Sequence, residues 1–233
     1  PHNSPRRQRQ MCIRDSNDIV KSGIKPLNAI EFKSLSEKAT VIDCRKPQEF
    51  AYSHVPNSLF IGIDGGFAPW AASVMKKLDE WVLLLVEEGR EHEAVTRLAR
   101  VGIDNTIGFL NGGIIAWENA GYKTETVHSI DAMQFESEIN TASNIIDVRN
   151  NGEYSNGHLT NSMFRPLDQI HQNISEYQSE TDYYIHCQGG YRSMIACSIL
   201  KANGVHNVTD VKGGFGAIAK STSLEITNEE IAI

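Results

Sequence analysis

The segment Tyr184-Ile185-His186-Cys187-Gln188-Gly189-Gly190-Tyr191-Arg192-Ser193 joins a short strand, 183–186, to a helix, 193–202, through a glycine-bearing loop. Such a loop leaves several backbone N–H groups unpaired at the start of a helix, where they and the helix dipole favour negative charge. The amides and Arg192 would stabilise the thiolate form of a cysteine placed there. The segment therefore predicts a nucleophilic Cys187 and an anion-binding Arg192. The residues predicted to line the cradle around the sulfur are Gln188, Gly189, Gly190, Tyr191 and Ser193.

The composition excludes several classes of protein. The chain has 233 residues, of which 40% are hydrophobic, and this is enough for one large or two small domains. Its net charge of −7 argues against nucleic acid as a partner, and no apolar run is long enough to predict a membrane span. The four cysteines form no C-x-x-C pair, so we expect no disulfide framework, no metal site and no cofactor, in a reducing cytoplasm. They are Cys12, Cys44, Cys187 and Cys197.

The first 16 residues differ from the rest of the chain. They carry four arginines and almost no apolar side chains, and the string 11–16 resembles translated vector sequence. A disordered basic tail is an equally good interpretation. We therefore exclude residues 1–16 from the fold, and the abrupt start predicts that the remainder is the rear part of a longer protein.

The chain repeats itself. Asp43-Cys44-Arg45 matches Asp147-Val148-Arg149 at an offset of 104 residues, and Gly112-Gly113 matches Gly213-Gly214 at an offset of 101. A period of this size corresponds to a whole domain rather than to a solenoid repeat. Strands and helices alternate in both copies, which predicts an α/β fold with parallel sheets covered by helices on both faces. We place the two domains at residues 17–124 and 125–233.

Four motifs together resemble the rhodanese-like sulfurtransferases over roughly residues 25 to 220. They are a D-x-R strand end, a Glu-aromatic pair, a His-x-x-x-Ser strand entry and the C-x-x-G-x-R loop that holds Cys187. The resemblance implies about five parallel strands in each domain and a persulfide on Cys187. It further implies transfer of a sulfane sulfur from thiosulfate or a low-molecular-weight persulfide to a thiol or cyanide. The expected partners are these small donors and acceptors.

The first copy departs from the motif at the loop. Its residues 87–92 read Glu-Glu-Gly-Arg-Glu-His, with no cysteine, and their carboxylates would repel an anionic donor. We expect Arg90 to take the place of Arg192 and the copy to serve as a scaffold or docking domain. Together with Phe67-Ala68-Pro69-Trp70, this loop resembles the rhodanese region of metallo-β-lactamase-fold persulfide dioxygenase fusion proteins. The resemblance therefore implies a dioxygenase domain of that kind as a partner in cis, although the iron-binding H-x-H-x-D-H motif is absent from this chain.

Some candidate residues have a structural interpretation that competes with the functional one. Asp147 and Arg149 end a strand near the loop, and we predict that they support it structurally, because Asp43 and Arg45 persist in the copy without the cysteine. Glu153 and His158 recur as Glu49 and His54, so the same reasoning makes them framework residues. Cys187 could also be an inert buried cysteine, Arg192 an ordinary surface arginine, and Cys197 is expected in the core.

Two other functions compete with sulfur transfer. A cysteine phosphatase also uses a His-Cys-loop-Arg motif, but four residues separate Cys187 from Arg192, and a phosphatase loop needs one more to surround a phosphate. The shorter loop favours a sulfur atom. The other alternative is a non-catalytic partner or regulatory module of a larger sulfide-oxidising protein, which the complete loop of the second copy argues against.

Overall fold

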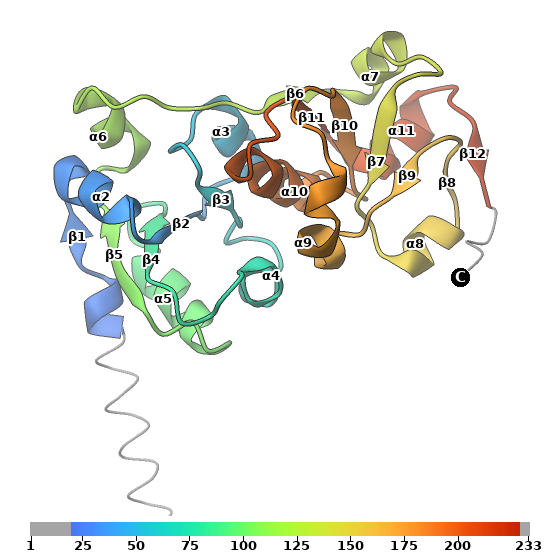
Figure 1. Cartoon of the computed structure of the whole chain (residues 1–233). Helices are drawn as coiled ribbons and strands as arrows, with labels where there is room; N and C mark the ends of the chain where they lie inside the picture. Colours follow the sequence, from blue (N-terminus) through green and yellow to red (C-terminus); the bar gives the residue numbers. More distant parts are fainter. Residues whose placement is uncertain (1–19, 229–233) are drawn as a thin grey trace, which may run out of the picture. The chain divides into compact units, whose positions relative to one another are not determined.

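The computed structural model describes residues 20–228, and the predicted tail of residues 1–16 lies outside them. The chain contains two five-stranded sheets, each built from parallel strand pairs and flanked by helices (Figure 1). The predicted α/β fold is therefore confirmed. The contacts of the chain group into two compact units, and the segment Lys46–Phe60 belongs with Thr124–Ile233 rather than with its neighbours in sequence.

The first sheet has the strand order β1-β5-β4-β2-β3. Its strands are β1 (Pro26–Leu27), β2 (Thr40–Asp43), β3 (Leu59–Phe60), β4 (Val82–Leu85) and β5 (Thr106–Leu110). The helices of this part of the chain are α2 (Ala29–Ser36), α3 (Pro47–Tyr52), α4 (Phe67–Val74), α5 (Glu91–Ala99) and α6 (Gly113–Asn119). All four residues of β4 are buried, as expected for a central strand of a parallel sheet that is covered on both faces.

The second sheet has the order β6-β11-β10-β7-β9. Its strands are β6 (His128–Ile130), β7 (Asn144–Asp147), β9 (Met163–Phe164), β10 (Tyr183–His186) and β11 (Val208–Val211), and β8 (His158–Leu159) pairs separately with β12 (Ile226–Thr227). The helices are α7 (Ala132–Glu138), α8 (Asn151–Ser155), α9 (Ile170–Asn173), α10 (Tyr191–Ala202) and α11 (Gly214–Ser221), with 3-10 turns η1 (Leu167–Gln169) and η2 (Ile174–Glu176).

The helix that follows the cysteine loop is almost wholly buried. Every residue of α10 from Ser193 to Leu200 is shielded from water, and α10 packs against β10 and β11. A helix that is enclosed on all sides has little freedom to shift. The position of α10 therefore fixes the position of the loop at its N-terminus.

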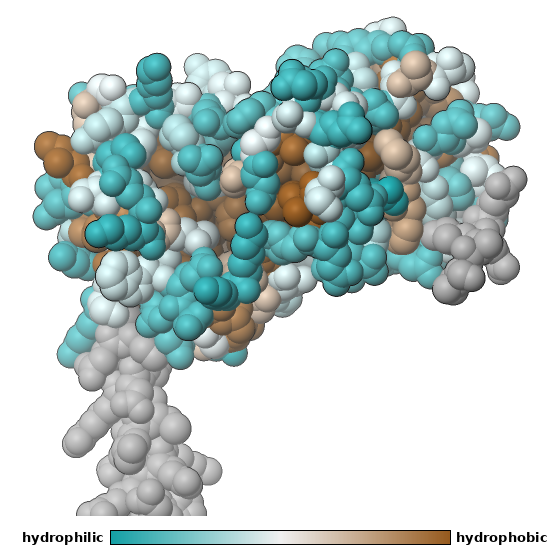
Figure 2. All heavy atoms as spheres, in the orientation of Figure 1, coloured by the Kyte–Doolittle hydropathy of each residue, from teal (hydrophilic) through white to brown (hydrophobic). Residues whose placement is uncertain are grey.

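The structure differs from the prediction mainly at short elements. The helix predicted from Ser193 begins at Tyr191, directly after its N-cap Gly190. The two- and three-residue strands β1, β6, β8 and β12 carry too little periodicity to be seen in the sequence. Residues 20–228 contain no helix long and apolar enough to cross a membrane, and hydrophilic side chains cover most of the face shown in Figure 2.

Candidate active site

Cys187 lies in a loop that turns sharply between β10 and α10. Gly190 is the N-cap of α10 and has a φ of 92°, a left-handed conformation that favours glycine. This turn directs the Gly190 N–H to the Cys187 Sγ at 3.1 Å. Cys187 itself is only 1% exposed. The structure thus places the predicted nucleophile at a helix N-terminus with a backbone donor on its sulfur, where a negative charge is stabilised.

The start of α11 holds this loop from the other side. The Phe215 N–H donates to the Cys187 carbonyl at 2.6 Å, and the Gly216 N–H donates to the Gln188 carbonyl at 3.1 Å. Gly214 lies so close that a Cβ on it would be 2.1 Å from the Cys187 carbonyl oxygen. No side chain fits in that space, so the Gly213-Gly214 pair is what lets α11 approach the loop.

A chain of hydrogen bonds runs from the sulfur into the core. The Cys187 thiol donates to the Ser193 Oγ at 3.6 Å, and this hydroxyl donates to Asp210 at 2.6 Å. Ser129 donates to the other Asp210 oxygen at 2.8 Å. Burial opposes the charge on Asp210 and raises its pKa to about 6, although both hydroxyl groups act in the opposite direction.

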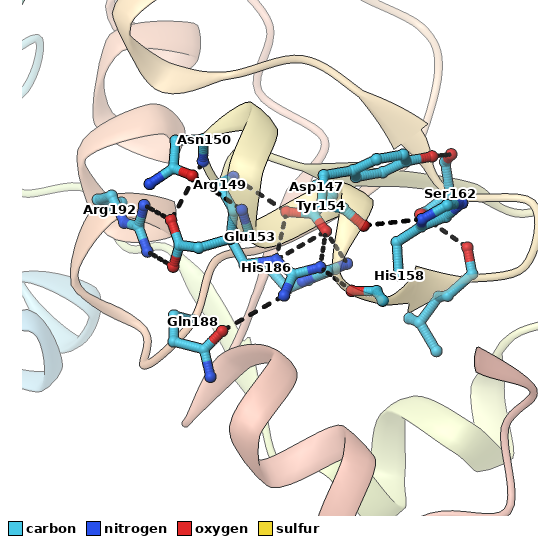
Figure 3. Close-up of polar contacts among 12 residues, drawn as sticks. Asp147, Arg149, Asn150, Glu153, Tyr154, His158, Ser162, His186, Gln188 and Arg192 are labelled. Carbon is cyan, nitrogen blue, oxygen red and sulfur yellow. Dashed lines mark hydrogen bonds and ion pairs between the residues drawn. The ribbon is translucent and has the colours of Figure 1, made fainter. Parts of the chain in front are cut away.

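Arg192 is held by a carboxylate. Its Nη1 and Nη2 atoms each donate to one oxygen of Glu153 at 2.6 Å, and the guanidinium and carboxylate face each other edge to edge (Figure 3). This bidentate pair is partly shielded, since the side chains are 18% and 26% exposed. The hydrogen bond from Arg192 is the main reason why the pKa of Glu153 lies below its usual value, so Glu153 is charged at neutral pH.

Asp147 and Arg149 lie beneath the loop as a buried ion pair. The Arg149 Nη2 donates to Asp147 at 2.7 Å and to the Gly157 carbonyl at 2.8 Å, and its Nη1 reaches the Gln188 side chain at 3.3 Å. Its guanidinium also lies 3.8 Å from the centre of the Phe215 ring. Arg149 therefore links β7, the cysteine loop and α11, an arrangement that supports the predicted bracing role.

Two further residues beside the loop are buried and uncharged. His186 is fully buried next to Cys187, and desolvation lowers its pKa, so the imidazole is neutral near pH 7. Burial raises the pKa of the Cys197 thiol well above its usual value. Cys197 is therefore a poor nucleophile. Within the described part of the chain, no group of acidic, histidine and cysteine side chains could hold a metal ion.

The loop of the first copy can be aligned with the Cys187 loop because the residue pairing between β2 and β4 is the same as that between β7 and β10. Asp43 pairs with Leu85 in one sheet, as Asp147 pairs with His186 in the other. Val86 therefore stands where the second copy has Cys187. Counted from the same register, Glu91 matches Arg192.

The prediction that Arg90 replaces Arg192 is therefore wrong by one residue. Gly89, with a φ of 85°, matches Gly190 and has the same left-handed conformation. Arg90, the next residue, therefore matches Tyr191 and not Arg192. The Arg90 guanidinium instead pairs with Asp64 at 2.7 Å and with Glu93 at 3.0 Å.

Sequence reasoning missed the roles of two acidic residues, Glu153 and Asp210. The recurrence of Glu153 as Glu49 predicts a framework role for both. The recurrence shows only that the carboxylate is present in both copies, and it says nothing of the partner Arg192, which the first copy lacks. The signal for Asp210 was a charged residue inside the apolar strand Val208–Val211. A buried acid in a strand indicates specific hydrogen-bond donors nearby.

Comparisons with known proteins agree with the geometry. The model of the rhodanese-like domain matches residues 28–120 and again 131–221. A sulfurtransferase of Allochromatium vinosum is 30% identical over 76 residues, which are 33% of this chain and 71% of that protein.

Two further relatives each match less than half of the chain. The uncharacterized protein YqhL of Bacillus subtilis is 35% identical over 71 residues, which are 30% of this chain but only 56% of that protein. The crystal structure of a rhodanese-like domain protein from Staphylococcus aureus is 31% identical and covers 43% of this chain and 99% of its own, with a TM-score of 0.38.

Proposed function

Because the chain belongs to the family of rhodanese-like domains, we propose that it is a sulfurtransferase that carries a sulfane sulfur on Cys187. The observation that supports this most directly is the Gly190 N–H at 3.1 Å from the Cys187 Sγ, at the start of α10. A persulfide anion formed on Cys187 would lie against the same backbone donor and helix dipole.

The proposed reaction has two halves. In the first, the Cys187 thiolate attacks the terminal sulfur of the donor. With thiosulfate the S–S bond breaks and sulfite leaves with the bonding electron pair, and with an alkyl persulfide the leaving group is the alkyl thiolate. In the second half, a thiolate or cyanide attacks the outer sulfur of the Cys187 persulfide, which releases an alkyl persulfide or thiocyanate and restores the Cys187 thiolate.

Intact-mass measurement tests the first half-reaction. We expect one added sulfur atom on the wild-type protein after incubation with thiosulfate or glutathione persulfide, and none on Cys187→Ser. Cys197→Ser is the matched control, because Cys197 is a buried thiol that should not accept sulfur. Absence of the adduct with every donor would overturn the proposal, as would an adduct on Cys187→Ser. Turnover of p-nitrophenyl phosphate would instead support the phosphatase alternative.

We assign the first copy a scaffold or docking role. Val86 replaces the cysteine there, and Glu87, Glu88 and Glu91 lie in the loop or directly after it, so an anionic donor would be repelled. A metallo-β-lactamase-fold dioxygenase domain in cis is a further proposed partner, for which the only support is the resemblance of this copy to dioxygenase fusion proteins. Cys44, Cys187 and Cys197 are all free thiols, which supports a reducing compartment such as the cytoplasm.

A further inference from the structure

The partly exposed cation of the active-site loop, Arg192, is already neutralised. Arg192 uses both of its terminal nitrogens to bind Glu153, at 2.6 Å each. The pair has no net charge, and its parallel geometry is that of a strong bidentate ion pair. An anionic donor that approaches Arg192 therefore meets a carboxylate together with the guanidinium.

The second arginine of the site cannot replace Arg192 as an anion receptor. Arg149 is 2% exposed and donates to Asp147, to the Gly157 carbonyl and to the Gln188 side chain. Its flat face covers the Phe215 ring. Freeing Arg149 would leave Asp147 buried without its partner, which is strongly unfavourable.

From this arrangement we propose that Glu153 is a specificity-determining residue that selects sulfur donors by charge. It disfavours donors with two negative charges, such as thiosulfate, and favours donors with one charge or none at the reacting group, such as alkyl persulfides and thiosulfonates. This inference rests on the proposed sulfur transfer through Cys187 and concerns which donor loads that residue.

The local fold of Glu153 supplies a matched control elsewhere in the chain. Glu153 accepts a hydrogen bond from the Asn150 N–H at 3.2 Å and so forms a capping box at the start of α8. Glu49 makes the same contact with the Lys46 N–H at 3.2 Å at the start of α3. A capping box accepts glutamine as well as glutamate. Glu153→Gln and Glu49→Gln therefore change the charge of equivalent residues while the caps stay intact.

Two donors isolate the effect of charge. Thiosulfate carries two negative charges, whereas methanethiosulfonate has a methyl group in place of one oxygen and carries only one. In both, the Cys187 thiolate attacks the terminal sulfur and the S–S bond breaks. Sulfite leaves from the first and methanesulfinate from the second, each with the bonding electron pair, and the product on the protein is the same persulfide.

The experiment compares the rate constants for loading Cys187 from the two donors, followed by intact mass. We expect the wild-type protein and Glu49→Gln to prefer methanethiosulfonate by the same factor. In Glu153→Gln, the ratio of the thiosulfate rate to the methanethiosulfonate rate should rise about tenfold, the factor expected when a cation becomes available for one charge-assisted hydrogen bond. This gain should shrink as salt is added, because the attraction involves a partly exposed charge.

A structural role for Glu153 gives a different result. If Glu153→Gln only loosened α8, loading from both donors would fall together and the ratio would stay unchanged, which overturns the proposal. Arg192→Gln provides a second check, since removal of the cation should abolish the effect of Glu153→Gln on the ratio. If neither donor loads the wild-type protein, the proposed function fails. If both donors load it but the ratio is the same in Glu153→Gln, only the charge filter fails.

Discussion

The loops after β4 and β10 have the same backbone plan but different side chains. Each follows a buried central strand, and each turns at a glycine with a left-handed φ, 85° at Gly89 and 92° at Gly190. The side chains that these loops carry, however, have different charges and different reactive groups. The changes at the sulfur and its hydrogen-bond chain, first copy against second, include Val86 and Cys187, Glu91 and Arg192, His92 and Ser193, and Phe109 and Asp210.

This comparison separates what builds the fold from what serves the site. The Asp-x-Arg ion pair is buried in both copies, with Arg45 to Asp43 at 2.6 Å and Arg149 to Asp147 at 2.7 Å. Asp210 is different, because the first copy has Phe109 in its place. A buried carboxylate is costly, and at this position it occurs only in the copy that carries the cysteine. The free-energy cost of burying the Asp210 carboxylate therefore serves the active site and is not needed to build the fold.

The largest difference between the copies should appear on substitution of the second glycine of each Gly-Gly pair. Gly214 and Gly113 have similar φ angles, 55° and 61°, so alanine strains the backbone equally. A Cβ on Gly214 would lie 2.1 Å from the Cys187 carbonyl oxygen, whereas on Gly113 it meets nothing within 4 Å. Gly214→Ala should destabilise the protein by more than about 4 kcal/mol and abolish sulfur loading. Gly113→Ala should cost about 1–2 kcal/mol.

Urea unfolding and intact mass measure these two effects. Equal losses of unfolding free energy in the two variants would show that left-handed strain, and not the approach of α11 to the loop, explains the sensitivity of Gly214. That result would weaken the idea that α11 holds the cysteine loop only in the second copy.

The Asp-x-Arg pairs should behave alike, since they belong to the shared framework. Asp147→Ala and Asp43→Ala each leave a buried arginine without its carboxylate, and each should cost about 3–5 kcal/mol. Chemical denaturation of both variants measures this. A cost much larger in the second copy than in the first would contradict the assignment of these residues to the framework.

Asp210 should make stability depend on pH. Its pKa is raised from 3.8 to about 6 by burial, so the folded protein holds a proton that the unfolded chain releases. The stabilising contribution is fully present below about pH 4 and is lost as pH rises through about 6, a total of at most about 3 kcal/mol. The lowered pKa of His186 changes stability in the opposite direction over the same pH range, so the effect of Asp210 is measured as a difference between variants. The unfolding free energy of the wild type minus that of Asp210→Asn should fall between pH 4 and 7, whereas the difference between the wild type and the exposed control Asp182→Asn should stay constant. A difference between the wild type and Asp210→Asn that does not change with pH would assign the dependence to another group.

Much of this molecule could be read from its sequence, and the exceptions have physical causes. The repeat predicted two parallel sheets because its matching strands, such as Thr40–Asp43 and Asn144–Asp147, have clear apolar patterns. The position of Cys187 followed from the glycine loop alone. The Glu153–Arg192 pair could not be predicted, since it joins residues 39 positions apart whose meeting depends on tertiary packing. Asp210 was likewise hidden because its donors, Ser129 and Ser193, come from other elements.

The smallest expected effect tests whether the backbone turn that the two loops share is enough for sulfur loading of a cysteine. Val86→Cys, made in the Cys187→Ser background, places a thiol of similar size at the equivalent position of the first copy. We expect no added sulfur by intact mass, because the three glutamates within residues 87–91 repel both the thiolate and the donor. In addition, there is open space next to Gly113, whereas Gly214 lies directly against the Cys187 carbonyl in the second copy.

The parent protein with Cys187→Ser alone measures background labelling in this experiment. Sulfur added to the double variant but not to this parent would show that the left-handed turn at Gly89 is enough by itself to create the site. The contribution of α11 and of the hydrogen-bonded Asp210 would then be to stability and not to sulfur loading. An unlabelled double variant instead indicates that the backbone turn needs the surrounding charge pattern, because the turn is the feature that the two loops share.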